Sequence, residues 1–163
     1  MYEAEIAAIK RDLGIEHLDI RFQWLPSRKY VNARRGSTGD HTHMNGWHRI
    51  RVATLGWTYE DVVKIIAHEL RHAWQFGTGV CATEWREGKR GGRGKMVYSW
   101  KGTNYCVARP EYLRSKVSYR SRPEEIDAYG YQDDAWRKLF GGQRKVAQTP
   151  KRAVAQAFLL AME

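Results

Sequence analysis

The chain has 163 residues, 28 of them Lys or Arg and 18 of them Asp or Glu, so its formal net charge is +10 at pH 7. This length is typical of one domain, whose folding buries about 70% of the surface that the unfolded chain exposes, so a core forms without a disulfide or a metal. The two cysteines, Cys81 and Cys106, exclude a disulfide framework and a four-cysteine zinc site, whereas the positive charge favours phosphate backbones, anionic surfaces or acidic partners.

The composition also bears on the compartment. Residues 1–10 alternate Glu with apolar residues and lack the basic start and continuous apolar run of a signal peptide. The apolar stretches fall far short of the about 18 residues that span a bilayer, and the low cysteine count favours a reducing compartment. We therefore expect a cytoplasmic protein with no membrane partner, folded as one domain over residues 1–163.

Periodicity and turn residues predict the elements of the first part of the chain. Apolar residues at helical spacing predict a helix over 2–13, which Gly14 ends. Alternating apolar and polar residues predict strands over 19–25 and 49–55. The segment 32–46 is rich in Gly, Asn, Ser and Thr, which predicts a loop.

The best-marked helix is predicted over 59–76. Thr58 is a good N-cap, and Asp61 stands three residues later, in the position of a capping-box acid. The apolar periodicity continues to Phe76, and Gly77 breaks it. The local signals at both ends therefore agree with the hydrophobic pattern between them.

The pattern in the second part of the chain predicts a hairpin followed by helices. Short strands over 81–85 and 96–105 flank a Gly-rich basic loop over 86–95. A proline opens a helix over 124–139, and a cap followed by a proline opens a last helix that continues from residue 150 to the C-terminus. Strands mixed with helices predict an α+β fold.

A helical wheel of the segment 59–76 places a carboxylate in an apolar face. Steps of about 100° per residue gather the apolar side chains into one arc, and Glu69 falls inside it. An unpaired buried charge is expensive, so Glu69 needs a special partner. The histidines fall at the border of the arc, and the other polar residues, Lys64, Arg71 and Gln75, cluster on the opposite side, which we expect to face solvent.

The segment His68-Glu-Leu-Arg-His72 has the H-E-x-x-H pattern. Histidines four residues apart share one face of a helix and can bind one metal ion. A zinc ion with three protein ligands keeps one position for water and lowers the pKa of that water toward about 7. Glu69 can accept the proton that this water gives up. The alternative is that His68 and His72 are ordinary border residues and that Glu69 pairs with an arginine.

This motif and a later segment resemble the zincin metallopeptidases. No histidine follows His72, which disfavours the metzincins and the SprT-like proteases, whose third ligand is a downstream histidine. Residues 121–132 (SRPEEIDAYGYQ) instead resemble the glutamate-bearing helix of gluzincins, particularly the small single-domain forms of bacteria and phages. The resemblance covers about 30 of the 163 residues. It implies a single zincin-like α+β domain with a small sheet packed against the H-E-x-x-H helix.

Three acids in this second segment compete for the role of third ligand. Glu124, Glu125 and Asp127 point in different directions around a helix, and Glu125 is our first choice. Gluzincins often place an Asp four residues after the ligand to hold the first histidine, and neither Glu124 nor Glu125 has one; Asp127, at a different spacing, is the residue available for such support. The alternative is that the acids only complement the helix dipole.

Other residues are candidates for substrate contacts. Four residues near the third-ligand helix are candidates for the donor that would stabilise the oxyanion of the reacting carbonyl, and the sequence does not distinguish among them. The strand 49–55 directly precedes the H-E-x-x-H helix and is a candidate edge for pairing with an extended peptide, and its arginines would favour acidic residues in the substrate. The four oxyanion candidates are Tyr119, Arg120, Tyr129 and Tyr131.

Two further clusters have alternative interpretations. His41, His43 and His48 form a second histidine cluster, in which the H-x-H pair of His41 and His43 could bind a metal on an extended strand. The simpler interpretation is that these are histidines of a surface loop. The basic loop over 89–95 (KRGGRGK), with aromatic residues at its base, resembles an RGG-like nucleic-acid contact, and a solvated hairpin tip explains it equally well. The residues concerned in this loop and its base are Lys89, Arg90, Arg93, Trp85, Tyr98 and Trp100.

The resemblance implies a zinc metalloendopeptidase with one zinc ion per chain. His68, His72 and Glu125 would bind the zinc, and Glu69 would activate water for the hydrolysis of peptide bonds. The competing hypothesis is a basic nucleic-acid-binding module whose zinc site is structural or inactive. A peptidase that acts on DNA-bound proteins would combine the two.

Overall fold

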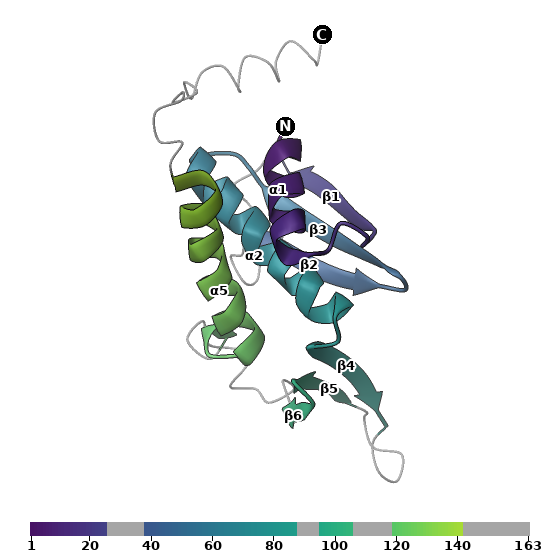
Figure 1. Ribbon diagram of the computed structural model, residues 1–163. Helices are drawn as coiled ribbons and strands as arrows, with labels where there is room; N and C mark the ends of the chain where they lie inside the picture. Colours follow the sequence, from purple (N-terminus) through teal and green to yellow (C-terminus); the bar gives the residue numbers. More distant parts are fainter. Residues whose placement is uncertain (26–37, 88–94, 106–118, 142–163) are drawn as a thin grey trace.

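In the computed structural model, residues 1–25, 38–87, 95–105 and 119–141 are described (Figure 1). Their helices and strands form a mixed α+β fold with two three-stranded sheets. In chain order, the elements are α1 (Glu3–Leu13), β1 (Ile20–Leu25), β2 (Gly39–Met44), β3 (Trp47–Ala53), α2 (Tyr59–Gly77), β4 (Cys81–Arg86), β5 (Lys95–Trp100), β6 (Thr103–Tyr105), α5 (Pro123–Ala135) and the π-helical turn η2 (Trp136–Phe140).

The first sheet has the strand order β1-β3-β2. Strand β1 runs parallel to β3, with Ile20 opposite His48, and β2 runs antiparallel to β3, with His43 opposite His48. Strand β3 is therefore the central strand, and among the described residues β1 and β2 form the two edges. The expectation that the strand 49–55 offers an edge to a substrate is wrong, because β3 is paired on both sides.

The prediction of a loop over 32–46 is also wrong in part, because residues 39–44 form strand β2. Composition suggested a loop, yet six consecutive pairs with β3 satisfy the backbone of this segment. The two residues Asn45 and Gly46 connect β2 to β3, and Gly46 has the positive φ of +80° that such a turn requires. An Asn-Gly pair between extended segments is a hairpin signal, and it also explains why β3 begins at Trp47 rather than at Arg49.

The predicted end of α1 and the predicted start of α2 are confirmed. Gly14 ends α1 in the left-handed conformation. At the start of α2, the Asp61 backbone N–H donates to Thr58 Oγ1 at 3.1 Å and the Thr58 N–H donates to Asp61 Oδ2 at 3.1 Å, which completes the capping box. Such a cap contributes about 1 kcal/mol. Helix α2 extends one residue beyond the predicted 59–76, to Gly77.

The second sheet, β4-β5-β6, lies beyond the C-terminal end of α2 (Figure 1). The predicted hairpin is confirmed, since β4 pairs with β5 from Cys81–Trp100 to Arg86–Lys95. The strand predicted over 96–105 is broken into β5 and β6. Lys101 and Gly102 make a tight turn there, with φ of 48° and 79°. The turn folds β6 back onto β5.

Helix α5 lies along α2 (Figure 1). Pro123 opens it at the first turn, as predicted, and the helix over 124–139 is divided into α5 and η2. The last helix, predicted from residue 150, lies outside the described residues. In the described part of the chain, no helix combines the length and apolar character needed to cross a membrane.

The core lies between the first sheet and helices α1, α2 and α5. Helix α2 contributes its apolar arc, as predicted, and β3 contributes the side chains that face it. Each large side chain buried in this way stabilises the fold by about 1.5–3 kcal/mol. Fully buried members include Ile9, Ile15, Ile50, Val52, Val62, Val63, Ile66 and Leu70.

Candidate metal centre

Helix α2 places two imidazoles side by side in the interior. His68 and His72 are one helical turn apart, and their Nε2 atoms are 3.1 Å apart. Both side chains are buried, so they lie deeper than the border position that the helical wheel assigned to them. Glu69 is also buried, which confirms that this carboxylate belongs to the apolar face of the helix.

Helix α5 brings a third potential ligand to the same place. Glu125 is 3% exposed, and its Oε2 lies 3.3 Å from His68 Nε2, while its Oε1 lies 3.5 Å from His72 Nε2. One ligand atom from each of the three residues lies within 4.8 Å of the others. Of the three acids considered in this segment, Glu125 is the one that reaches the histidine pair.

The other two acids have different partners. The Glu124 carboxylate accepts a hydrogen bond from the Tyr105 hydroxyl, on β6. Asp127 accepts two hydrogen bonds from the guanidinium of Arg71, from Nε at 2.7 Å and from Nη2 at 3.0 Å. Neither carboxylate belongs to the histidine cluster. The structure therefore distinguishes the roles of the three acids, which the sequence alone left open.

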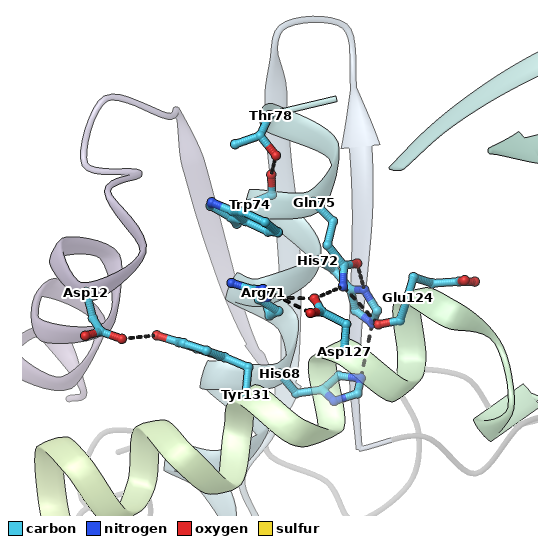
Figure 2. Close-up of polar contacts among 10 residues, drawn as sticks. All are labelled: Asp12, His68, Arg71, His72, Trp74, Gln75, Thr78, Glu124, Asp127 and Tyr131. Carbon is cyan, nitrogen blue, oxygen red and sulfur yellow. Dashed lines mark hydrogen bonds and ion pairs between the residues drawn. The ribbon is translucent and has the colours of Figure 1, made fainter. Parts of the chain in front are cut away.

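Gln75 connects the histidines to this outer network (Figure 2). Its side-chain oxygen lies 2.8 Å from His72 Nδ1, and because an amide oxygen only accepts, His72 Nδ1 is the donor. Gln75 Nε2 donates to the Glu124 carbonyl oxygen at 2.9 Å and to Asp127 Oδ2 at 2.8 Å. The relay orients the His72 ring so that Nε2 faces Glu125, and it gives Asp127 an indirect supporting role.

The prediction that one side of α2 faces solvent is wrong, because α5 covers that side. Gln75 is 0% exposed. Arg71 is partly buried, and its guanidinium lies 3.8 Å from the centre of the Trp74 ring and 5.1 Å from that of Tyr131. Lys64 bridges Glu60 and Asp133. A helical wheel identifies one apolar face, and it contains no information about a second helix that packs through polar contacts.

Glu69 lies against the backbone of strand β2. A Cβ atom added to Gly39 would stand 2.5 Å from Glu69 Oε1, so only a glycine fits there without displacing the carboxylate. Burial raises the pKa of Glu69, and the neighbouring His68 and His72 oppose this effect without reversing it. A carboxylate with a raised pKa accepts a proton more readily near neutral pH.

The cluster is arranged to hold positive charge. Burial alone would raise the pKa of Glu125, but hydrogen bonding to His68 and His72 outweighs it and lowers that pKa well below its ordinary value. Burial would lower the pKa of His72, but Glu125 outweighs it and raises the pKa to about 9. The carboxylate therefore stays ionised and stabilises a cation beside it, whether a proton or a metal ion.

The geometry of the three groups fits a metal ion. With bonds of about 2.0–2.1 Å, two ligands of a tetrahedral zinc ion lie about 3.3 Å apart. The two histidine Nε2 atoms are 3.1 Å apart, and Glu125 faces them with different oxygens, Oε2 at 3.3 Å from His68 Nε2 and Oε1 at 3.5 Å from His72 Nε2. With one ligand atom from each residue, the three atoms lie within 4.8 Å of one another. Glu125 Oε2 has its contact with His68 Nε2 at 3.3 Å, and among the described residues His68 Nδ1 is buried without a hydrogen-bond partner. This buried group of two imidazoles and one carboxylate can hold a metal ion.

The four candidates for an oxyanion donor differ in whether they lie near the histidine cluster. The Tyr129 ring packs 4.6 Å from that of His68, and the guanidinium of Arg120 lies 5.2 Å from the Tyr129 ring. Burial, the charge of Glu125 and a hydrogen bond with Glu125 raise the pKa of Tyr119. Tyr131 instead donates to Asp12 Oδ2 at 3.0 Å, away from the cluster (Figure 2).

The remaining predicted site residues lie elsewhere. His41 and His43 are on β2 and His48 is on β3, so the interpretation of a loop cluster is wrong. Trp85 is exposed on β4, whereas Tyr98 and Trp100 on β5 are partly buried. The basic residues proposed to contact nucleic acid, Lys89, Arg90 and Arg93, lie outside the described residues, as does Cys106, while Cys81 is buried.

Comparisons of the chain with protein-family models, with curated proteins and with solved structures gave no match.

Proposed function

We propose that the chain is a zinc-dependent metallopeptidase with a zincin-like domain, in which His68, His72 and Glu125 bind one zinc ion. The observation that carries the proposal is the convergence of His68 Nε2, His72 Nε2 and a Glu125 oxygen in a buried cluster, with the buried carboxylate of Glu69 on the same turn of α2 near enough to feel the charges of all three residues. Two histidines and a carboxylate are a typical ligand set of catalytic zinc, which leaves one position for water or substrate.

Zinc bound there would supply Lewis acidity, polarising the peptide carbonyl and lowering the pKa of water. The protein supplies the proton transfers. The Glu69 carboxylate accepts a proton from the attacking water and then donates it to the nitrogen of the leaving amine. Its raised pKa suits both steps, because the group must gain and lose a proton near neutral pH. Gln75 keeps His72 in the tautomer that presents Nε2 to the zinc.

Strand β2 is the edge that can position a substrate. It is paired on one side with β3, and its Gly39 lies against Glu69. An extended peptide that pairs with the outer edge of β2 would pass close to the Glu69 carboxylate. The proposed preference for acidic substrates loses one of its arguments, because Arg51 pairs with Asp40 of the neighbouring strand.

The test is hydrolysis of a fluorogenic peptide library by the zinc-loaded protein. Glu69→Gln should lower kcat/KM by about 10²- to 10⁴-fold, the usual value of a general base, and leave the zinc content unchanged. Glu60→Gln, on the first turn of the same helix, is the matched control and should keep full activity. Unchanged activity in Glu69→Gln, or no cleavage of any library member by the zinc-loaded protein, would contradict the proposal.

A further inference from the structure

A second cluster of imidazoles lies on the first sheet, outside the proposed zinc site. His41 and His43 are two residues apart on β2, so their side chains lie on the same face of the strand. His48 stands directly opposite His43 on β3. The hairpin therefore gathers three of the chain's six histidines on one patch of the sheet, which we call the histidine trio.

Two of these imidazoles already have the spacing of ligands to one ion. His41 Nε2 lies 2.9 Å from His48 Nδ1, and the ring centres are 5.1 Å apart. Without an ion, this contact requires one nitrogen to carry a proton and the other to accept it. Replacing that proton by a metal at about 2.0–2.1 Å from each nitrogen needs an N···N spacing of about 3.3 Å. The rings would have to separate by only a few tenths of an ångström.

The third imidazole is adjacent and able to move. The ring of His43 stacks on that of His48, with centres 4.8 Å apart, and His43 is exposed. Rotation of an exposed side chain displaces no buried group, so His43 can turn its ring to complete a set of three ligands. Phe76, on the last turn of α2, packs against His41 and His43 at 5.5 and 5.8 Å between ring centres. One side of the trio is thus closed by an aromatic ring.

Burial and donor chemistry limit the ions that suit the trio. His48 is 4% exposed, so its side chain is shielded from solvent. Since the trio contains no carboxylate, it favours ions that prefer imidazole, such as zinc, copper(II) and nickel(II), over magnesium or calcium.

We propose that His41, His43 and His48 form a second binding site for a divalent transition-metal ion, with solvent as a further ligand. The site is distinct from the cluster of His68, His72 and Glu125, although the two adjoin, since the rings of His41 and His72 are 6.2 Å apart. It does not depend on the proposed peptidase function, because none of its ligands is shared.

The test is equilibrium dialysis of the folded full-length protein against zinc, with the zinc content measured per chain. The wild type should bind two zinc ions, and His43→Ala should bind one. His68→Ala should also bind one, which separates this proposal from the peptidase proposal. His17→Ala, which removes an exposed histidine from another part of the chain, is the matched control and should bind two.

Copper(II) provides a second readout. In His68→Ala, the spectrum of one bound copper(II) ion in electron paramagnetic resonance should show splitting by several imidazole nitrogens, and the additional change His43→Ala should reduce that splitting. Because His43 is exposed, its substitution should leave the thermal unfolding curve unchanged. The proposal is overturned if wild type and His43→Ala bind the same number of zinc ions, or if the copper spectrum does not respond to His43→Ala.

Discussion

Helix α5 and strand β2 both pack against α2, and they bring different chemistry to it. Helix α5 contributes carboxylates: Glu125 faces the histidine pair, and Asp127 binds Arg71 and Gln75. Strand β2 contributes a glycine that leaves room for Glu69, together with His41 and His43 of the trio. One side of the helix therefore supplies negative charge to the interior, and the other supplies space and imidazoles.

This difference indicates that the two proposed metal sites, which lie on either side of α2, differ in strength. A buried cation is stabilised when an anion lies beside it, and only the α5 side provides that anion. The α5 side is also held by a connected hydrogen-bond network, whereas the trio includes an exposed ring. We expect zinc to bind more tightly between α2 and α5 than at the trio.

The largest effect should follow from removal of the negative charge on the α5 side. Glu125→Gln should weaken zinc binding at this cluster by more than about 100-fold, because residues that merely hydrogen-bond to zinc ligands already contribute about 10- to 100-fold. Competition with a chelator of known affinity measures the change. Glu124→Gln, the same substitution one residue earlier, is the control and should retain affinity, since its carboxylate faces Tyr105. Equal losses in both variants would refute the assignment of Glu125.

A smaller loss is expected from the hydrogen-bond network behind His72. Gln75→Leu keeps the approximate volume and removes the acceptor for His72 Nδ1, so zinc affinity should fall by about 10- to 100-fold. Gln23→Leu, on the exposed face of β1, is the control. If the two variants bind zinc equally well in the chelator assay, the relay does not orient His72.

The β2 side should affect turnover rather than zinc binding. In Gly39→Ala, the new methyl group would stand 2.5 Å from Glu69 Oε1 and 2.7 Å from a methyl group of Ile65, so the carboxylate must move. We expect kcat to fall by about tenfold with zinc content unchanged, as for a misplaced catalytic group. Gly130→Ala, where a Cβ atom meets nothing within 4 Å, should leave kcat unaltered. Lost zinc in Gly39→Ala would contradict this division of roles.

The smallest effect concerns the attachment of α5 to the rest of the fold. Asp12 of α1 binds Tyr131 and Lys138, and although burial opposes it, these partners lower the pKa of Asp12. A lowered pKa means that the carboxylate stabilises the fold above about pH 4 and loses this contribution as the pH falls through its folded value. Asp12→Asn should therefore cost about 1 kcal/mol at pH 7 in denaturant unfolding, and the difference from wild type should shrink in acid. A difference that is constant with pH would show that the charge is irrelevant.

Local sequence signals predicted the part of the site that lies on one helix. The spacing of His68 and His72 and the capping box around Thr58 are properties of consecutive residues, so periodicity alone places them. The burial of Glu69 followed from the position of this residue in the apolar arc. These features need no knowledge of which elements pack together.

Tertiary contacts decided the rest. The rotation of α5 about its own axis determines whether Glu124, Glu125 or Asp127 faces the histidines, and no local pattern encodes that rotation. Gln75 was assigned to solvent because a wheel cannot reveal a polar helix interface. Strand β2 was missed because its small and polar residues become a strand only through pairing with β3, although the Asn45-Gly46 pair was an available signal.

The zinc content of two variants tests the central claim most directly. In His43→Ala, where the trio is incomplete, dialysis against zinc followed by a brief chelating-resin step should leave one zinc ion per chain, bound by His68, His72 and Glu125. In the double variant His43→Ala/His68→Ala, with an unchanged circular dichroism spectrum, the same treatment should leave none. Equal zinc contents in the two proteins would contradict the claim that these three residues form a metal site.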